Sequence, residues 1–366
     1  MAGLYIHIPF CAQKCAYCDF VSFAGRDCEE EYITAVLSEM KAYPQQDIDT
    51  VFIGGGTPSY ISEDNIARLL NEAGAHFYLK RDAEITLECN PSSLSCQKLQ
   101  VYKSAGVNRL SIGLQSSLDE ELKLLGRLHD YNRFVQAYEW SRREFSNINI
   151  DLISSLPGQT WEDFELTLEK AVSISPEHIS VYSLIIDEHT PLGVKVDKGE
   201  LKPISEEEDR RIYHKTGGFL EKAGYARYEI SNYALSGREC RHNLNYWLGG
   251  DYIGLGCAAH SCYDNKRYHN ACDLNGYLHN PHARYEVQEL NREDRLLECI
   301  MLELRLISGI DRSRFKARFG RDIYELYTQR IDMLVQNGLL QLTPQALRLT
   351  DKGLDLADWA VLQLIS

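Results

Sequence analysis

The sequence of 366 residues has no long apolar segment and no excess of basic residues. No stretch approaches the roughly 18 consecutive apolar residues of a transmembrane helix. The first residues, MAGLYIHIPF, show neither the basic nor the apolar region of a secretory signal, so we expect a cytoplasmic protein. The formal net charge of −14 disfavours nucleic acid as a partner, because proteins that bind phosphate backbones usually present a basic surface.

Internal repeats and low-complexity tracts are also absent, and the first half of the chain alternates between two kinds of segment. Short β-branched or aromatic runs predict strands, and the longer amphipathic segments between them predict helices. The expected strands are residues 4–8, 50–53, 84–88, 108–113, 148–152 and 178–184. The expected helices lie near residues 29–42, 62–73, 94–105, 118–142 and 161–173. Such α/β alternation indicates parallel strands joined by right-handed crossovers, as a partial (β/α)6 barrel, with a doubly wound open sheet as the alternative.

The rest of the chain has a different composition, and we expect three domains. An α/β barrel covers residues 1–185, an irregular region over the barrel mouth covers 186–290, and a mainly helical, winged-helix-like domain covers 291–366. Within the middle region, 205–223 has a helical pattern, whereas 225–275 is rich in Gly, Tyr, Asn and His. The last domain contains 11 Lys and Arg and 11 Asp and Glu, so it lacks the basic excess that a DNA-binding regulator would need.

Three cysteines, Cys11, Cys15 and Cys18, follow the first expected strand within eight positions. In a cytoplasmic chain, clustered thiols are more often metal ligands than disulfide partners. A structural zinc site takes four ligands, whereas a [4Fe–4S] cluster held by three thiolates keeps one iron open to an exchangeable ligand. The spacing therefore favours an iron–sulfur cluster, and a zinc site completed by His7 is the alternative.

This Cys-x3-Cys-x2-Cys spacing, with Tyr17 before the third cysteine, resembles the signature of the radical S-adenosylmethionine (SAM) superfamily. The longer string LYIHIPFC..KC.YCDF is similar to the group that contains anaerobic coproporphyrinogen III dehydrogenase (HemN) and the related heme chaperones (HemW). In the superfamily, the amino and carboxylate groups of SAM bind the open iron, and reductive cleavage of SAM generates a 5′-deoxyadenosyl radical. The resemblance thus implies a [4Fe–4S] cluster, SAM, and an electron donor if the cluster is reduced.

Further motifs of this family lie at the ends of expected strands or in the turns beyond them. They are GGGTPS at 54–59, LECNP, SIGLQS, LGRLHD and NIDLISSLPGQT. Taken singly, the glycines suit a tight turn and each polar residue suits a helix cap or the surface. The resemblance instead implies that SAM is bound by Tyr5, Tyr17, Gly55, Gly56, Thr57, Glu88, Gln115, Arg127 and Asp151. In the dehydrogenase several of these positions contact a second SAM.

Two departures separate the chain from the dehydrogenase. That enzyme has a fourth cysteine where this chain has Phe20, and it carries an N-terminal extension before the first strand. Conversely, HNLNYW at 242–247 is similar to a motif of the heme chaperones and implies His242 as a heme ligand, with His260, His269 and Cys240 as weaker candidates. We therefore expect a heme chaperone that binds heme and transfers it to an acceptor protein. The alternative is an oxygen-independent coproporphyrinogen III dehydrogenase or another radical SAM enzyme acting on a tetrapyrrole.

Overall fold

The structure of the protein is a computed structural model that describes residues 2–365. At its centre is a curved sheet of six parallel strands. Their order is β1-β4-β5-β6-β7-β8, and every neighbouring pair is parallel. Their bounds are β1 (Ala2–Ile8), β4 (Asp47–Gly55), β5 (Tyr78–Cys89), β6 (Arg109–Gln115), β7 (Ile148–Ser154) and β8 (His178–Ser183). The six strands predicted from the sequence are all present. Their carboxyl ends lie along one rim, which is where functional side chains of such barrels gather.

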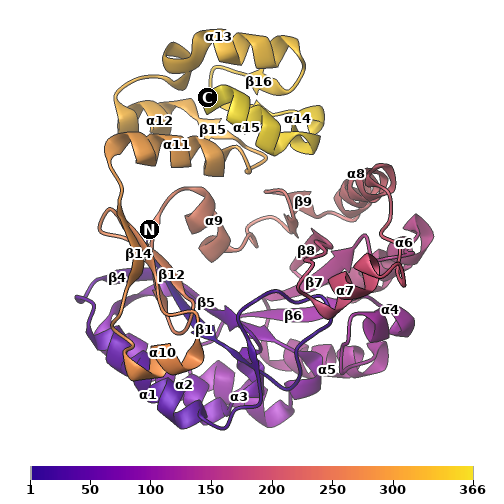
Figure 1. The fold of residues 1–366 in the computed structure, drawn as a ribbon, viewed down its shortest axis with the longest axis vertical. Coiled ribbons are helices and arrows are strands. Elements are labelled where there is room, and N and C mark those ends of the chain that lie inside the picture. Colours follow the sequence, from indigo (N-terminus) through magenta and orange to yellow (C-terminus); the bar gives the residue numbers. More distant parts are fainter. Residues whose placement is uncertain (1, 366) are drawn as a thin grey trace.

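Helices cover the outer face of this sheet (Figure 1). They are α1 (Glu29–Lys41), α2 (Glu63–His76), α3 (Cys96–Ser104), α4 (Asp119–Leu124), α5 (Tyr131–Glu144) and α6 (Trp161–Ser173). Side-chain caps begin α2 and α6, because Ser62 accepts the Asp64 amide and Thr160 forms a reciprocal capping box with Asp163. The prediction of a single helix at 118–142 was wrong. It is two helices, because the chain turns at Gly126, whose φ of 71° lies in the left-handed region.

The segment expected to be irregular instead extends the sheet at both edges. At one edge, β10 (Asn232–Ala234) pairs antiparallel with β8, followed by β9 (Ala226–Arg227). At the other edge, β11 (Asp251–Leu255) pairs parallel with β1, and the sheet continues through β12 (His260–Tyr263), β13 (Lys266–His269) and β14 (Tyr285–Glu289). These strands are too short to show a period-2 pattern. Only β10 and β11 pair with the edges of the central sheet, and the other strands are added outside them. Since β1 and β8 do not pair, the barrel stays partial.

A short helix, α9 (Arg241–Trp247), connects the two edges and packs against β1, β4 and β11. The Glu84 carboxylate on β5 accepts the backbone amides of Arg241 and His242, each at 3.1 Å. These amides are free helix-end donors, and a carboxylate is favoured beside them. Glu84 therefore fixes the HNLNYW segment against the inner face of the sheet.

The C-terminal part forms a separate module with its own apolar core. It comprises α11 (Arg292–Glu303), β15 (Ile310–Asp311), α12 (Arg312–Phe319), α13 (Ile323–Gln336), β16 (Leu340–Leu342), β17 (Ala346–Leu349), α14 (Asp351–Asp355) and α15 (Ala357–Ile365). The strands β16 and β17 form a hairpin, and β15 adds a third strand to it. None of the described helices is long and apolar enough to cross a membrane.

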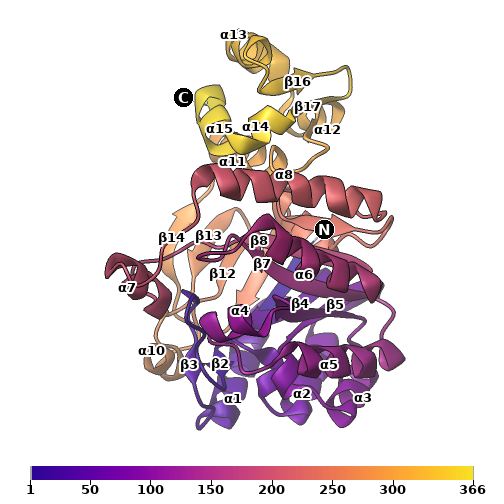
Figure 2. The same ribbon diagram turned by 90° about the vertical axis from the view of Figure 1, so that its right-hand side faces the viewer.

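The remaining elements are short, apart from α8. They are β2 (Phe10–Cys11), β3 (Phe23–Ala24), α7 (Pro191–Asp197), α8 (Glu206–Lys222), α10 (Leu274–His279) and the short 3-10 turns Pro58–Tyr60 and Pro91–Ser93. Helix α8, predicted at 205–223, runs between the barrel and the module (Figure 2). His214 on α8 lies 2.9 Å from the Asp355 carboxylate at the end of α14. Contacts of this kind hold the module beside the open side of the barrel.

Acid should destabilise the fold through its buried histidines, of which His129 is the simplest to isolate. Its Nε2 lies 3.2 Å from the Leu114 carbonyl, and burial with the nearby Arg127 charge lowers its pKa to about 3. As pH falls through 6.5, the unfolded chain takes up a proton that folded His129 does not. We predict that His129→Gln makes the loss of unfolding free energy shallower by about 1.4 kcal/mol per pH unit between pH 6 and 4.

Urea denaturation followed by tryptophan fluorescence at several pH values measures this slope. His189→Gln, at a side chain that is 84% exposed, is the matched control and should leave the slope unchanged. A slope that is equally steep in His129→Gln and the unaltered protein would contradict the assignment.

Candidate functional site

The three predicted cysteines lie in one loop at the carboxyl end of β1. Cys11 is in β2, which pairs with β3, and the segment between them carries Cys15 and Cys18. Two backbone hydrogen bonds fix the middle of the loop: the Ala16 amide donates to the Leu125 carbonyl at 2.9 Å, and the Ala16 carbonyl accepts from Leu192 at 2.8 Å. The loop is therefore held by the neighbouring segments around α4 and α7.

The thiols suit a multi-iron cluster better than a single metal ion. Cys11 is buried and Cys15 and Cys18 are half-buried, and all three are free thiols. Among the described residues, no group of three or more His, Cys, Asp or Glu side chains could hold a single ion. His7 cannot readily complete a zinc site, because its Nδ1 lies 3.0 Å from Tyr5 Oη and its Nε2 lies 3.0 Å from the Val21 carbonyl. Soft thiolates spread along one loop fit the larger iron–sulfur cluster.

The glycine-rich end of β4 packs directly against this loop. A Cβ at Gly55, whose φ is +112°, would come within 2.5 Å of the His7 ring, and a Cβ at Gly56 would come within 3.0 Å of Cys11 Sγ. The Gly56 amide donates to the Ile8 carbonyl at 2.8 Å, and Thr57 Oγ1 lies 3.4 Å from Cys11 Sγ. Only glycine allows this approach, so the structure places Gly55, Gly56 and Thr57 beside the cysteine loop.

Arg127 and Gln115 lie on the opposite side of the loop. Arg127 Nη1 donates to Cys15 Sγ at 3.6 Å and Nη2 donates to the Gly113 carbonyl at 3.2 Å, while its buried Nε has no partner among the described residues. Gln115 ends β6 with a φ of +71° after a register shift. Tyr17 lies in a small apolar cluster with Leu125 and with residues of the loop after β7. These groups surround the thiols on the side away from β4.

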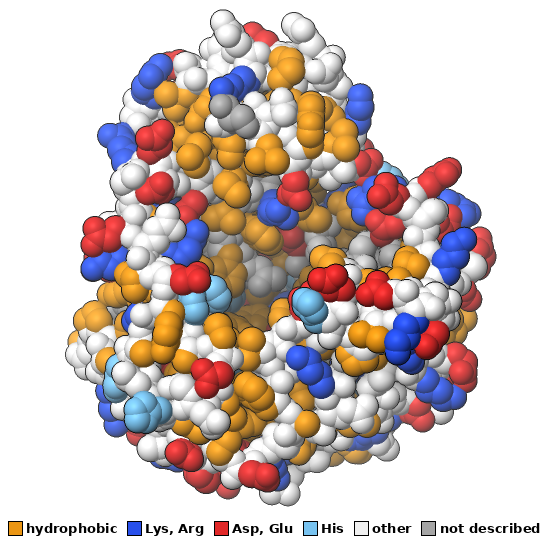
Figure 3. All heavy atoms as spheres, in the orientation of Figure 1, with side chains coloured by type: hydrophobic (Ala, Val, Ile, Leu, Met, Phe, Trp, Pro, Cys, Tyr) orange, Lys and Arg blue, Asp and Glu red, His pale blue; other side chains and the backbone are white. Residues whose placement is uncertain are grey.

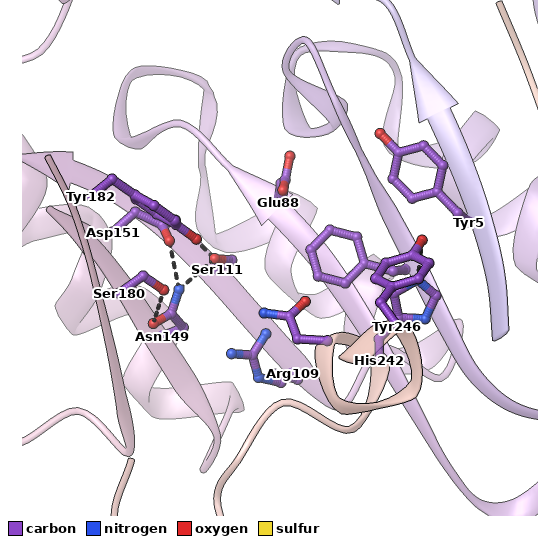
Figure 4. A pocket seen from close by; sticks show the side chains of 12 residues that line it. Tyr5, Glu88, Arg109, Ser111, Asn149, Asp151, Ser180, Tyr182, His242 and Tyr246 are labelled. Atoms are coloured by element: carbon purple, nitrogen blue, oxygen red, sulfur yellow. Dashed lines mark hydrogen bonds between the residues drawn. The ribbon is translucent and has the colours of Figure 1, made fainter. Parts of the chain in front are cut away.

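Glu88, Asp151 and Tyr5 face a cavity of about 210 Å³ inside the barrel (Figure 4). Glu88 accepts the Gly55 amide at 3.1 Å. Burial, with a smaller effect of Asp151, raises the pKa of Glu88 to about 8, so this carboxyl group is mainly protonated at pH 7 and can donate a hydrogen bond. Asp151 accepts from Ser111 Oγ and from the Asn149 amide, both at 2.8 Å. The predicted SAM residues thus divide between the cysteine loop and the barrel interior.

His242 occupies a different environment from the one a ready heme ligand would need. It is 1% exposed and stacks on Phe52, with ring centroids 5.2 Å apart. Its Nδ1 lies 2.8 Å from Thr50 Oγ1 and its Nε2 lies 2.9 Å from Tyr246 Oη. Burial lowers its pKa to about 3, which keeps the imidazole neutral. Iron ligation by His242 stays a prediction, and it requires Tyr246 to release Nε2.

A larger cavity of about 870 Å³ lies between the barrel, α9 and the C-terminal module. Figure 3 shows the hollow on this face, with apolar side chains gathered around it. Phe20, Tyr246, Trp247, Tyr252 and Leu302 contribute apolar surface, and His260 also lines it. A cavity of this volume suits a large planar or drug-sized ligand. The sequence indicated it only through the aromatic HNLNYW motif and the unexpected Phe20.

Sequence reasoning missed the polar residues that line the barrel interior. Arg109, Ser111, Asn149, Ser180 and Tyr182 all face the smaller cavity. Their signal was present, because polar side chains alternate with apolar ones inside strands that are buried on both faces. Such strands are normally apolar throughout. The arginine of NRLSIG is one of these inward-facing polar residues.

The fold and this loop define a class of protein, and the comparisons agree with it. Residues 5–171 match the family described as the Radical SAM superfamily, and residues 290–356 match the HemN C-terminal domain. Membership of this class implies a [4Fe–4S] cluster and SAM, and the donor set described above fits both. In overall structure the chain is similar to coproporphyrinogen III oxidase (HemN) from Escherichia coli, with a TM-score of 0.87 at 23% identity over 100% of this chain and 90% of that one. At this identity the likeness establishes the fold.

Relatives that align with nearly the whole chain identify the family within this class. The chain is 35% identical to heme chaperone HemW of Bacillus subtilis over 364 residues, covering 96% of each protein. It is also 35% identical to heme chaperone HemW of Escherichia coli over 365 residues, and 32% identical to that of Mycobacterium tuberculosis over 378 residues. These alignments cover 96% and 99% of this chain and 94% of each relative. The chain belongs to the HemW family.

Loss of the loop thiols should abolish the cluster. We predict that Cys11, Cys15 and Cys18 changed together to Ala reduce reconstituted iron from about 4 atoms per chain to background, because no other described group replaces the three thiolates. Iron and acid-labile sulfide analysis after anaerobic reconstitution measures the effect. Cys96→Ala, at an exposed cysteine of α3, should retain the cluster. A triple variant that keeps its iron and sulfide would contradict the assignment.

Proposed function

We propose that this protein is a heme chaperone, which binds heme in the larger cavity and transfers it to an acceptor protein. The observation that carries the proposal is the cavity of about 870 Å³ with its aromatic lining, in a chain similar over its full length to proteins named heme chaperone HemW. Flat aromatic side chains offer a porphyrin large apolar contact areas. We propose an acceptor protein that binds heme more tightly than this protein does.

The cysteine loop would hold the [4Fe–4S] cluster beside this cavity. Cys11, Cys15 and Cys18 would supply three thiolates, and SAM would complete the coordination of the cluster. When bound, the cluster supplies electrons and SAM supplies a cleavable sulfonium bond. An external electron donor is required only if SAM is cleaved. The chain itself contributes positioning: Gly55 and Gly56 let the end of β4 pack closely against His7 and Cys11, and Arg127 puts a positive charge against Cys15.

Phe20 supports the chaperone over the porphyrinogen dehydrogenase. Its side chain is 64% exposed and lines the larger cavity. At this position the dehydrogenase has a cysteine, and a phenyl ring offers apolar contact in place of a reactive thiol. An exposed phenyl ring in a cavity is favourable when an apolar ligand covers it.

We also propose a cytoplasmic location, supported by eleven cysteines of which none forms a disulfide.

For the iron ligand, the described conformation favours His260 over His242. Neither ring nitrogen of His260 has a hydrogen-bond partner among the described residues, and the side chain is exposed to the cavity. Partial burial, with a smaller effect of His269, lowers its pKa, so the neutral form that ligates iron predominates near pH 7. His242 would have to break its hydrogen bond to Tyr246 first. We therefore propose His260 as the axial ligand in this conformation.

Heme transfer tests the proposed function. The anaerobically reconstituted protein should bind heme and lose it to apomyoglobin, used as an acceptor probe, with the Soret band reporting the exchange. With reduced cluster, SAM and coproporphyrinogen III, it should form no protoporphyrinogen IX. Formation of protoporphyrinogen IX by a protein that binds no heme would establish the dehydrogenase instead.

The same heme titration on three variants identifies the iron ligand. His260→Ala should weaken heme binding and shift the Soret band. His269→Ala is the matched control, because its ring centroid lies 5.1 Å from that of His260 while its Nδ1 is bonded to the Asn270 carbonyl. If His242→Ala loses heme binding and His260→Ala binds heme like the unaltered protein, the axial ligand is His242 and not His260.

A further inference from the structure

Arg109, at the start of β6, is a buried cation without a partner. It is 2% exposed, and its Nε is a buried donor without a hydrogen-bond acceptor. None of its guanidinium nitrogens forms a hydrogen bond or an ion pair with any described residue. Burying a charge without a counter-ion is costly, and proteins rarely tolerate it unless a ligand or partner neutralises the charge.

The two carboxylates whose charge reaches Arg109 are engaged elsewhere. Glu84 accepts the first amides of α9 and the Cys240 thiol, and Asp151 accepts from Ser111 and Asn149. The other polar groups of this wall also satisfy one another. Ser180 Oγ donates to Asn149 Oδ1 at 3.1 Å, and Asn149 Nδ2 donates to Ser111 Oγ at 2.7 Å. The guanidinium of Arg109 therefore keeps hydrogen-bond donors that these neighbours do not use.

The guanidinium points into the smaller cavity. Figure 4 shows Arg109 between Asn149 on one side and His242 on the other. This cavity, about 210 Å³, shares Tyr5, Tyr182, Asn243 and Tyr246 with the larger one, so the two spaces adjoin. The larger cavity has room for a porphyrin ring, whereas the smaller one has room for a short side arm. A chain of a few atoms that ends in an anion would reach from one space toward the other.

We propose that Arg109 binds a carboxylate, and that this carboxylate is one propionate of the heme held in the larger cavity. The inference rests on the proposed function and extends it, because it specifies how the ring is oriented. A guanidinium presents paired N–H donors that match a carboxylate in a bidentate arrangement. With one propionate anchored in the barrel, the porphyrin ring lies against α9 and faces His260. SAM also carries a carboxylate, and the experiment separates these two sources.

Comparing the binding of heme with that of its dimethyl ester tests the proposal, because the ester keeps the ring and the iron but lacks the negative charges of both propionates. In the reconstituted protein, heme should bind roughly 10- to 100-fold more tightly than the diester, as charge-assisted hydrogen bonds in a buried site imply. Arg109→Gln should reduce the affinity for heme to that for the diester and leave the diester unchanged. Arg109→Lys should fall between the two. Arg81→Gln, at an exposed arginine of the adjacent strand β5, should bind both ligands like the unaltered protein.

Several outcomes would overturn the proposal. Equal affinity of the unaltered protein for heme and the diester excludes an anchored propionate, and this comparison needs no variant to fold. Equal weakening of both ligands in Arg109→Gln indicates a structural role only. A loss of SAM binding with unchanged heme binding would assign the carboxylate to SAM. If the unaltered protein binds neither heme nor the diester, the proposed function itself fails, and this inference fails with it.

Discussion

The close contact between the end of β4 and the cysteine loop determines how the rest of the site is arranged. Gly55 adopts a left-handed φ of +112° directly against the His7 ring, and Gly56 leaves 3.0 Å between its virtual Cβ and Cys11 Sγ. Any larger residue would push the loop away from the strand ends. Because the contact holds Cys11 against the rim, the open side of the loop faces the barrel cavity.

The barrel interior itself is built for a ligand and not for packing. Strands buried on both faces are usually apolar, yet here the inward positions of β5 to β8 carry Glu88, Arg109, Asp151 and their hydrogen-bonding neighbours. Polar groups at this depth lower stability unless they are satisfied. Asn149 and Ser111 satisfy each other and Asp151, while Arg109 is left for a ligand. The apolar packing that stabilises the domain lies instead between the sheet and its outer helices.

Much of this organisation follows from local sequence. Six β-branched segments with capped helices between them predict the barrel, since each crossover obeys the same handedness. The cysteine spacing predicts the metal-binding loop and the glycines at 54–56 predict a tight turn, but the contact between the two was not predicted. The break at Gly126 and the edge strands β10 to β14 were missed. Each of those strands is short, and the two that join the central sheet, β10 and β11, pair with β8 and β1, which lie far away in the sequence.

The site was predictable only where its chemistry is local. His242 stands in a recognisable motif, but its burial under Tyr246 and against Thr50 depends on where Glu84 fixes α9. The large cavity arises from the docking of the C-terminal module beside α9, which no motif encodes. Arg109 was missed because a lone arginine in a strand is ordinary until the fold shows that it is buried without a partner.

The central claim is that three thiolates hold a cluster with one iron open to SAM. Electron paramagnetic resonance of the reduced, reconstituted protein tests it most directly, recorded with and without SAM. We predict that SAM changes the g values of the cluster signal, because its amino and carboxylate groups bind the open iron. A [4Fe–4S] signal that saturating SAM leaves unchanged would contradict the claim.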